Sequence, residues 1–91
     1  MEIEELIKQG ATLIDVRTVE EFEEGSVEGA INIPLHTIPA RVEEFKDMKP
    51  PIVCFCRSGN RSNQAMLYLK SQGVETFNGG GVEDMMKFMS E

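Results

Sequence analysis

Hydrophobic residues follow a helical spacing in some segments of the chain and form short continuous runs in others. The two kinds of segment alternate. Spacings of three and four predict helices, and short apolar runs rich in β-branched residues predict buried strands. The expected helices cover residues 3–10, 18–25, 37–46, 61–73 and 82–89, and the expected strands cover residues 11–16, 30–33, 51–55 and 74–77, followed by a turn at 78–81. Strands that alternate with helices indicate an α/β fold, with a small, mostly parallel central sheet flanked by helices on both faces.

Two helices carry more specific expectations. Thr18 and Glu21 have the spacing of a capping box, so Glu21 is interpreted as a helix cap rather than an acid catalyst. The last helix places a stripe of large apolar side chains on one side, and this stripe is expected to fill the core. These residues are Val82, Met85, Met86 and Met89, with Met86 or Phe88 as residues that could edge a pocket.

Composition and charge limit the possible functions. Ninety-one residues predict one domain, 1–91, with 41% hydrophobic and 27% charged residues as in ordinary globular proteins. The net charge of −7 argues against nucleic-acid binding, which needs a basic face. No apolar run approaches the roughly 20 residues of a membrane span. Residues 1–10 are acidic and amphipathic, unlike a signal or transit peptide, and they fit either a natural start or a mature end left by cleavage.

The two cysteines are separated by one residue. On a strand, the Cα atoms of Cys54 and Cys56 would lie roughly 6.5 to 7 Å apart, at or beyond the usual limit for a disulfide. Two thiols and the single histidine, His36, do not supply four metal ligands, so no metal site is expected. Free thiols are typical of a reducing compartment, which favours a cytoplasmic protein. Cys54 is expected to be strand core, and His36 a surface loop residue.

Cys56 ends the most hydrophobic run and is followed by the polar segment Arg57–Ser62. Gly59 can adopt a positive φ in a tight turn, and the helix that begins near Arg61 would point its free N–H groups back at the sulfur. These amides, with Arg57 and Arg61, would lower the pKa of Cys56 and hold an anionic substrate. The alternative is an inert, buried thiol beside two solvated arginines.

The spacing between Cys56 and Arg61 separates two chemistries. Cysteine-dependent phosphatases place the arginine after five intervening residues, whereas four intervene here. The shorter loop fits poorly around a tetrahedral phosphate but can surround a persulfide. Phosphoester cleavage also needs a general acid, and this loop contains no Asp or Glu. The spacing therefore favours sulfur transfer over a phosphatase or arsenate reductase.

Three motifs in order resemble the rhodanese-like sulfurtransferases of the compact, single-domain type. They are LIDVRTVEEFEEGSVEGAINIP (13–34), CRSGNRS (56–62) and FNGGGVEDM (77–85). The chain departs from the family in three ways. Ser26 replaces a frequent histidine, Met85 replaces the closing tryptophan, and the short strand before the first helix is missing. These departures affect the helix packing and the pocket rim more than the cysteine loop.

The resemblance implies a rhodanese-like fold and a double-displacement reaction without a cofactor. Cys56 would take sulfur from a small anionic, thiosulfate-like donor, and a thiol, a protein or cyanide would accept it. The backbone amides of Arg57, Ser58, Gly59, Asn60, Arg61 and Ser62 would stabilise the persulfide. The alternative within this fold is a non-catalytic sulfur-relay or regulatory module. A monomer is expected.

Four charged residues near the cysteine loop and the end of a predicted strand are assigned roles within this interpretation. Arg57 would face the donor, and Arg61 would either share that role or pin the loop through ion pairs. Asp15 and Arg17 end a predicted strand and are interpreted as a structural ion pair rather than as catalytic groups.

Overall fold

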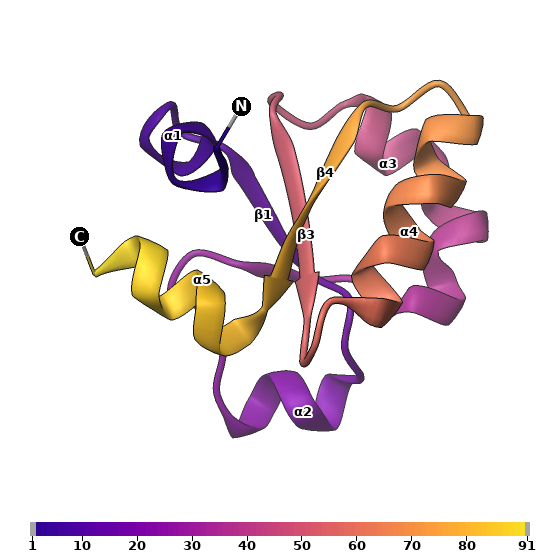
Figure 1. Cartoon of the computed structure of the whole chain (residues 1–91). Helices are drawn as coiled ribbons and strands as arrows, with labels where there is room; N and C mark the ends of the chain where they lie inside the picture. Colours follow the sequence, from indigo (N-terminus) through magenta and orange to yellow (C-terminus); the bar gives the residue numbers. More distant parts are fainter. Residues whose placement is uncertain (1, 91) are drawn as a thin grey trace.

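The four strands form one parallel sheet in the order β2-β1-β3-β4 in the computed structural model, which describes residues 2–90 (Figure 1). The elements along the chain are α1 (Ile3–Lys8), β1 (Thr12–Asp15), α2 (Val19–Glu24), β2 (Ile31–Asn32), the 3₁₀ helix η1 (Leu35–Arg41), α3 (Val42–Lys46), β3 (Ile52–Cys56), α4 (Asn60–Ser71), β4 (Thr76–Gly81) and α5 (Val82–Met89). The predicted α/β class with a parallel sheet is confirmed. No helix within residues 2–90 is long and apolar enough to cross a membrane.

Strand β3 lies in the middle of the sheet and is buried on both faces. Its five residues are all buried, and they alternate between two hydrophobic clusters. Cys54 and Cys56 belong to the cluster beneath η1, α3 and α4, and Val53 and Phe55 belong to the cluster beneath α1 and α5. Figure 1 shows α1 and α5 on one side of the sheet, α3 and α4 on the other, and α2 across the end to which β3 points. The Cys56 thiol therefore lies on the α4 side, at the carboxyl edge of the sheet.

The predicted turn at residues 78–81 is wrong, because β4 continues through Gly81. Beyond a register shift, Gly81 pairs with Cys56. The glycines permit this close approach. A Cβ atom at Gly79 would lie 2.6 Å from Met85 Sδ and 2.9 Å from the Val53 side chain. A Cβ atom at Gly81 would collide with the carbonyl oxygen of Arg57. These glycines bring β4 and α5 close to the cysteine loop.

The helix expected over residues 37–46 is two helices in the structure. A 3₁₀ helix begins earlier, at Leu35, and contains Pro39, and the α-helix starts only at Val42. Proline removes a backbone donor, so a short 3₁₀ segment carries the chain past Pro39 before the α-helical hydrogen bonds begin. The helix expected from residue 61 begins one residue earlier, at Asn60.

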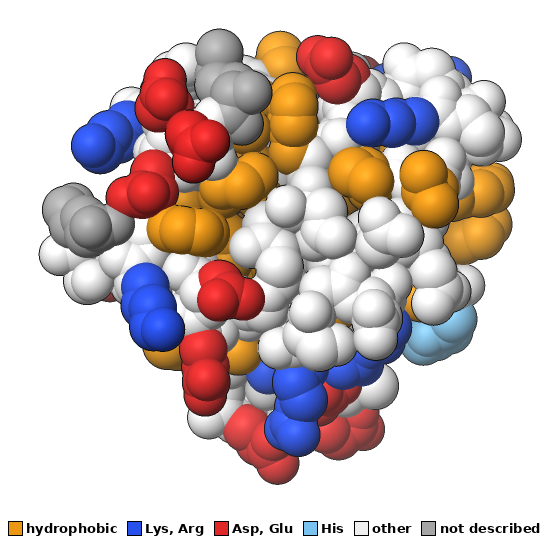
Figure 2. Space-filling model, viewed as in Figure 1, with side chains coloured by type: hydrophobic (Ala, Val, Ile, Leu, Met, Phe, Trp, Pro, Cys, Tyr) orange, Lys and Arg blue, Asp and Glu red, His pale blue; other side chains and the backbone are white. Residues whose placement is uncertain are grey.

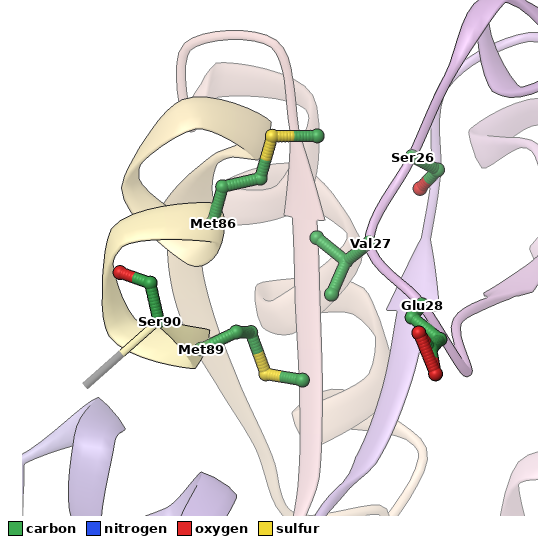
Figure 3. A pocket seen from close by; sticks show the side chains of 6 residues that line it. All are labelled: Ser26, Val27, Glu28, Met86, Met89 and Ser90. Carbon is green, nitrogen blue, oxygen red and sulfur yellow. The ribbon is translucent and has the colours of Figure 1, made fainter.

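The methionine stripe of α5 is core filler only in part. Met85 is fully buried, but Met86 and Met89 are 46% and 39% exposed. The packed face of α5 contains Val82, Met85 and Phe88 instead, because α1 covers that side of the helix. Figure 3 shows Met86 and Met89 pointing toward Val27 across a surface hollow. The expectation for Met86 and Met89 is wrong, and this hollow lies on the sheet face opposite the Cys56 thiol.

Candidate active site

The cysteine loop joins the end of β3 to the beginning of α4. Cys56 is the last residue of the strand, and Asn60 is the first of the helix. Gly59 turns the chain between them with a φ of 100°, a conformation that favours glycine. The turn therefore depends on glycine, and it folds the loop back over the fully buried Cys56.

Three polar groups of the loop and of the first turn of α4 contact the Cys56 sulfur. The Gly59 N–H donates to Sγ at 3.0 Å, and the Ser62 N–H does so at 3.5 Å. The Ser62 hydroxyl oxygen lies 3.4 Å from Sγ. Burial raises the pKa of the Cys56 thiol, but hydrogen bonds from Ser62, Gly59 and Ser58 outweigh it and lower the pKa below its ordinary value. The arrangement favours the thiolate, which is the nucleophilic form of cysteine.

A second layer of hydrogen bonds holds Ser62 and the turn in place. The Ser62 hydroxyl donates to Asn78 Oδ1 at 2.7 Å, and the Gly80 N–H donates to the same oxygen at 2.9 Å. The Asn78 amide nitrogen donates to the Gly59 carbonyl oxygen at 3.0 Å. A serine hydroxyl has one proton, so it cannot donate to Asn78 and to the sulfur at once, but its oxygen can accept from the Cys56 thiol while the proton points to Asn78. Asn78 was not among the predicted site residues, because its segment was expected to be a turn.

Both arginines of the loop face Glu21 of α2. Arg61 Nη1 lies 2.7 Å from Glu21 Oε1, and Nη2 lies 3.1 Å from Oε2, whereas Arg57 Nε lies 3.8 Å from Oε2. The Arg61 and Thr18 hydrogen bonds lower the pKa of Glu21 to about 2. Figure 2 shows acidic and basic side chains gathered together at the end of the molecule that α2 occupies in Figure 1. The positive charges of Arg57 and Arg61 therefore interact with the Glu21 carboxylate and do not act on the Cys56 sulfur alone.

Glu21 has two structural roles, of which the sequence indicated one. The capping box is present, with the Glu21 N–H donating to Thr18 Oγ at 3.2 Å and the Thr18 N–H donating to Glu21 Oε1 at 3.1 Å. The cap interpretation is confirmed. The same carboxylate also holds Arg61, a contact between residues 40 positions apart that local spacing does not indicate. Glu21 thereby connects α2 to the cysteine loop.

Asp15 and Arg17 form a buried ion pair at the end of β1. Arg17 Nη2 lies 2.8 Å from Asp15 Oδ2 and donates to the Gly25 carbonyl oxygen at 2.7 Å. The Ser26 hydroxyl donates to Asp15 Oδ2 at 2.8 Å. Ser26, one of the departures from the family pattern, therefore adds a hydrogen bond to this pair. The pair ties the end of β1 to the segment after α2.

The other polar candidates lie outside this cluster. Cys54 is fully buried and free, and burial raises its pKa to about 12, so it stays a neutral thiol. His36 is exposed as predicted, but it lies in the 3₁₀ helix η1 rather than in a loop, and Asn60 is exposed at the start of α4. Residues 2–90 contain no group of three or more His, Cys, Asp and Glu side chains placed to hold a metal ion.

Comparison with known proteins gives consistent matches. The rhodanese-like domain model matches residues 1–86. A sulfurtransferase of Allochromatium vinosum is 43% identical over 61 residues, which cover 67% of this chain and 56% of that protein. Thiosulfate sulfurtransferase PspE of Escherichia coli K12 is 35% identical over 74 residues, which cover 79% of this chain and 71% of that protein. The match therefore spans little more than half of the first relative.

The fold is matched as well. A solved structure of a rhodanese with anions from E. coli has a TM-score of 0.73 and is 34% identical, and the match covers 81% of this chain and 89% of that one. The family match over residues 1–86 includes all of the residues that form the sheet and the cysteine loop. The chain belongs to the rhodanese-like domain family.

Proposed function

We propose that residues 1–91 form one rhodanese-like domain that acts as a sulfurtransferase through a persulfide on Cys56. One observation carries this proposal. The Cys56 sulfur lies at the end of β3, where it accepts hydrogen bonds from the Gly59 and Ser62 amides, and the pKa of its thiol is lowered. The relatives named sulfurtransferase support the reaction class. The four residues between Cys56 and Arg61 favour sulfur over phosphate as the group held in the loop.

The first half-reaction loads the sulfur. The Cys56 thiolate attacks the outer sulfur of a thiosulfate-like donor, a new S–S bond forms, and the donor's own S–S bond breaks. Sulfite leaves with the electron pair of that bond, so the step needs no general acid and no cofactor. The amides of Gly59 and Ser62, which donate to Sγ before the reaction, stabilise the persulfide afterwards.

The two loop arginines have different roles in this proposal. Arg57 is 72% exposed in its side chain and lies 3.8 Å from Glu21, so its guanidinium is available to an anionic donor. Arg61 makes two short hydrogen bonds to Glu21 and pins the loop against α2. Asp15 and Arg17 support the edge of the sheet beneath this assembly.

The second half-reaction passes the outer sulfur to a thiophilic acceptor. A thiol, a protein or cyanide serves as the acceptor, and the Cys56 thiolate is regenerated. We further propose that the protein works as a monomer and that it is cytoplasmic. The two free thiols support the second point, because a reducing compartment keeps thiols free.

Cyanide-dependent formation of thiocyanate from thiosulfate tests this function. Cys56→Ser should abolish thiocyanate formation, and Cys54→Ser should retain it, because Cys54 lies inside β3 with a pKa near 12. The two variants make the same chemical change two residues apart, so each serves as the control for the other. Full activity in Cys56→Ser would overturn the proposed mechanism.

Complete burial of Cys56 favours a second candidate, a sulfur-relay module. In such a module the loop would accept sulfur only from a protein donor that docks against it, and small donors would not react. Wild-type protein that stays unmodified in thiosulfate but loses its Cys56 thiol to a persulfide-bearing protein would support this candidate over the enzyme.

A further inference from the structure

The Asn78 side chain contacts two of the residues that bond the Cys56 sulfur. Asn78 pairs in register with Cys54 of β3, so its side chain lies on the α4 face of the sheet, which is the face of the Cys56 thiol. Its Nδ2 donates to the Gly59 carbonyl oxygen at 3.0 Å, and its Oδ1 lies 2.7 Å from the Ser62 hydroxyl oxygen. The N–H groups of Gly59 and Ser62 both donate to Sγ. Asn78 is therefore placed to affect the sulfur through its neighbours.

The orientation of the Asn78 amide is fixed by two backbone partners. The Gly80 N–H can only donate, and it lies 2.9 Å from Oδ1. The Gly59 carbonyl oxygen can only accept, and it lies 3.0 Å from Nδ2. Turning the amide over would set donor against donor and acceptor against acceptor. The atom that faces the Ser62 hydroxyl is therefore an oxygen, which accepts a hydrogen bond but cannot donate one.

This orientation gives the Ser62 hydroxyl two directions. While Cys56 is a thiol, the hydroxyl proton points to Asn78 Oδ1, and the S–H can donate to Ser62 Oγ across 3.4 Å. A thiolate has no proton to donate, so the hydroxyl can turn about its Cβ–Oγ bond and donate to Sγ instead. The Gly80 N–H still bonds Oδ1 after this turn, so that oxygen keeps a partner. The proton changes its hydrogen-bond partner, and no covalent bond breaks.

We propose that Asn78 is a positioning residue that competes with the Cys56 sulfur for the Ser62 proton. In the resting thiol, Asn78 holds this proton away from Sγ. When Cys56 becomes a thiolate, including the thiolate released from a persulfide, Ser62 turns and stabilises its charge. Asn78 thereby sets how strongly Ser62 favours the thiolate. The role in persulfide release rests on the proposed sulfurtransferase function, whereas the effect on the thiol does not.

The pH dependence of Cys56 alkylation measures this competition without any sulfur donor. The midpoint of the profile reports the Cys56 pKa. The shift that each Asn78 substitution causes is measured with Ser62 present and again in a Ser62→Ala background. The difference between the two shifts is the part that runs through the Ser62 hydroxyl. The remaining part, which includes the altered Gly59 turn and any added charge, is the same in both backgrounds and cancels.

Two substitutions should change this Ser62-dependent part in opposite directions. Asn78→Asp offers a carboxylate, which is a stronger acceptor than an amide, so it should hold the Ser62 proton more tightly and raise the Cys56 pKa. Asn78→Leu is similar in size but has no acceptor, so the proton should pass to Sγ and lower the pKa. A residue that only supported the fold would shift the midpoint by the same amount with and without the Ser62 hydroxyl.

Asn32→Asp is the matched control for the added charge. Asn32 lies in β2 of the same sheet, and its Nδ2 donates to the backbone carbonyl oxygens of Asp15 and Arg17. Its Ser62-dependent shift should be zero. Besides the Asp15–Arg17 pair, the charged and titratable side chains around the loop are unchanged in every variant, so their effects cancel. They are Cys54 of β3, Glu21 of α2, His36 of η1, Arg57 of the loop, Arg61 of α4 and Asp84 of α5.

The outcomes decide the inference and separate it from the proposed function. Ser62-dependent shifts of opposite sign for Asn78→Asp and Asn78→Leu, with none for Asn32→Asp, would support it. Shifts of equal sign, or no dependence on Ser62, would overturn it. If Asn78→Leu fails to fold, the two aspartate variants decide, because an upward Ser62-dependent shift in Asn78→Asp alone supports the inference and its absence overturns it. A wild-type protein that takes up no sulfur would overturn the proposed function but not this competition.

Discussion

The link between Glu21 and Arg61 leads to a quantitative prediction about stability. Glu21→Gln removes the charge that faces Arg61 and Arg57, but glutamine can still serve as the third residue of a capping box with Thr18. The substitution therefore isolates the ion pair from the helix cap. We expect the free energy of unfolding to fall because one part-buried, doubly bonded contact between α2 and the cysteine loop is lost.

The size of the loss follows from the pKa of Glu21. Its hydrogen bonds to Arg61 and Thr18 lower that pKa from 4.5 to about 2. At about 1.4 kcal/mol per pKa unit, this depression corresponds to at most about 3.5 kcal/mol. The Thr18 contribution survives in the variant, and solvent screens a pair whose side chains are 20% and 34% exposed. We therefore expect a decrease of about 1 to 2 kcal/mol at neutral pH.

Urea denaturation across a pH series measures this difference. A carboxylate whose folded pKa is depressed contributes stability that is complete above its unfolded value, near 4.5, and is lost as the pH falls toward its folded value of about 2. The gap between wild type and Glu21→Gln should therefore be constant above pH 4.5 or so and close toward pH 2. A gap that persists unchanged at the acid end, or no gap at neutral pH, would refute the reasoning.

Glu44→Gln is the matched control for this experiment. Glu44 also makes two hydrogen bonds to an arginine, Arg41, at 2.8 and 2.9 Å. The two residues are three positions apart, and the Glu44 side chain is 53% exposed. An exposed local pair contributes little because solvent screens it, so its loss should be much smaller than that of Glu21. Equal losses of unfolding free energy from both substitutions would show that neither burial nor the link to the cysteine loop strengthens the Glu21 ion pair.

Three further changes test the loop itself. Ser62→Ala removes one hydrogen-bond partner of the Cys56 sulfur and should raise the Cys56 pKa, measured from the pH dependence of alkylation. An unchanged profile would contradict the assigned contact. Gly81→Ala forces the Arg57 carbonyl oxygen to move and should lower kcat at least about tenfold, whereas full activity would show that the loop tolerates the shift. Cys54→Ser buries a hydroxyl inside β3 and should lower the melting temperature while Cys56 alkylation continues at the wild-type rate, and slower alkylation would count against a purely structural Cys54.

Local patterns in the sequence were enough to predict most of the fold. The apolar run at residues 51–55 predicted the central strand, which the structure places one residue later, and the Thr18 spacing predicted the cap of α2. Both signals arise from residues close together in the chain. The alternation of strands with helices then indicated the parallel sheet. These features were readable because periodicity and capping depend on neighbouring residues.

The parts that the sequence did not reveal depend on contacts across the fold. Gly79 and Gly81 were expected in a turn, but they lie in β4. Close packing against α5 and the cysteine loop leaves no room for a Cβ atom at these positions, which explains why both are glycine. Met86 and Met89 follow the helical spacing of a core stripe, yet α1 covers the neighbouring face of α5 instead. Periodicity gives the face of a helix only approximately, and the packing partner decides which residues are buried.

The residues of the candidate site also divide into those with a local signal in the sequence and those whose roles depend on contacts across the fold. Cys56, Gly59 and the following helix start were identified from the order of residues, because a strand end, a glycine and a helix N-terminus are local features. Asn78, which holds both Ser62 and the turn, lies 16 residues beyond Ser62 and carried no local signal. Arg61 was left with two alternatives, and its bonds to Glu21 appear only when α2 folds across the loop.

Intact mass spectrometry after treatment with thiosulfate tests the central claim, that Cys56 is the sulfur-carrying nucleophile, most directly. The wild-type protein and Cys54→Ser should each gain the mass of one sulfur atom, peptide mapping should locate it on Cys56, and Cys56→Ser should gain nothing. A sulfur atom on Cys54, an adduct in Cys56→Ser, or an unmodified wild-type protein would contradict the account.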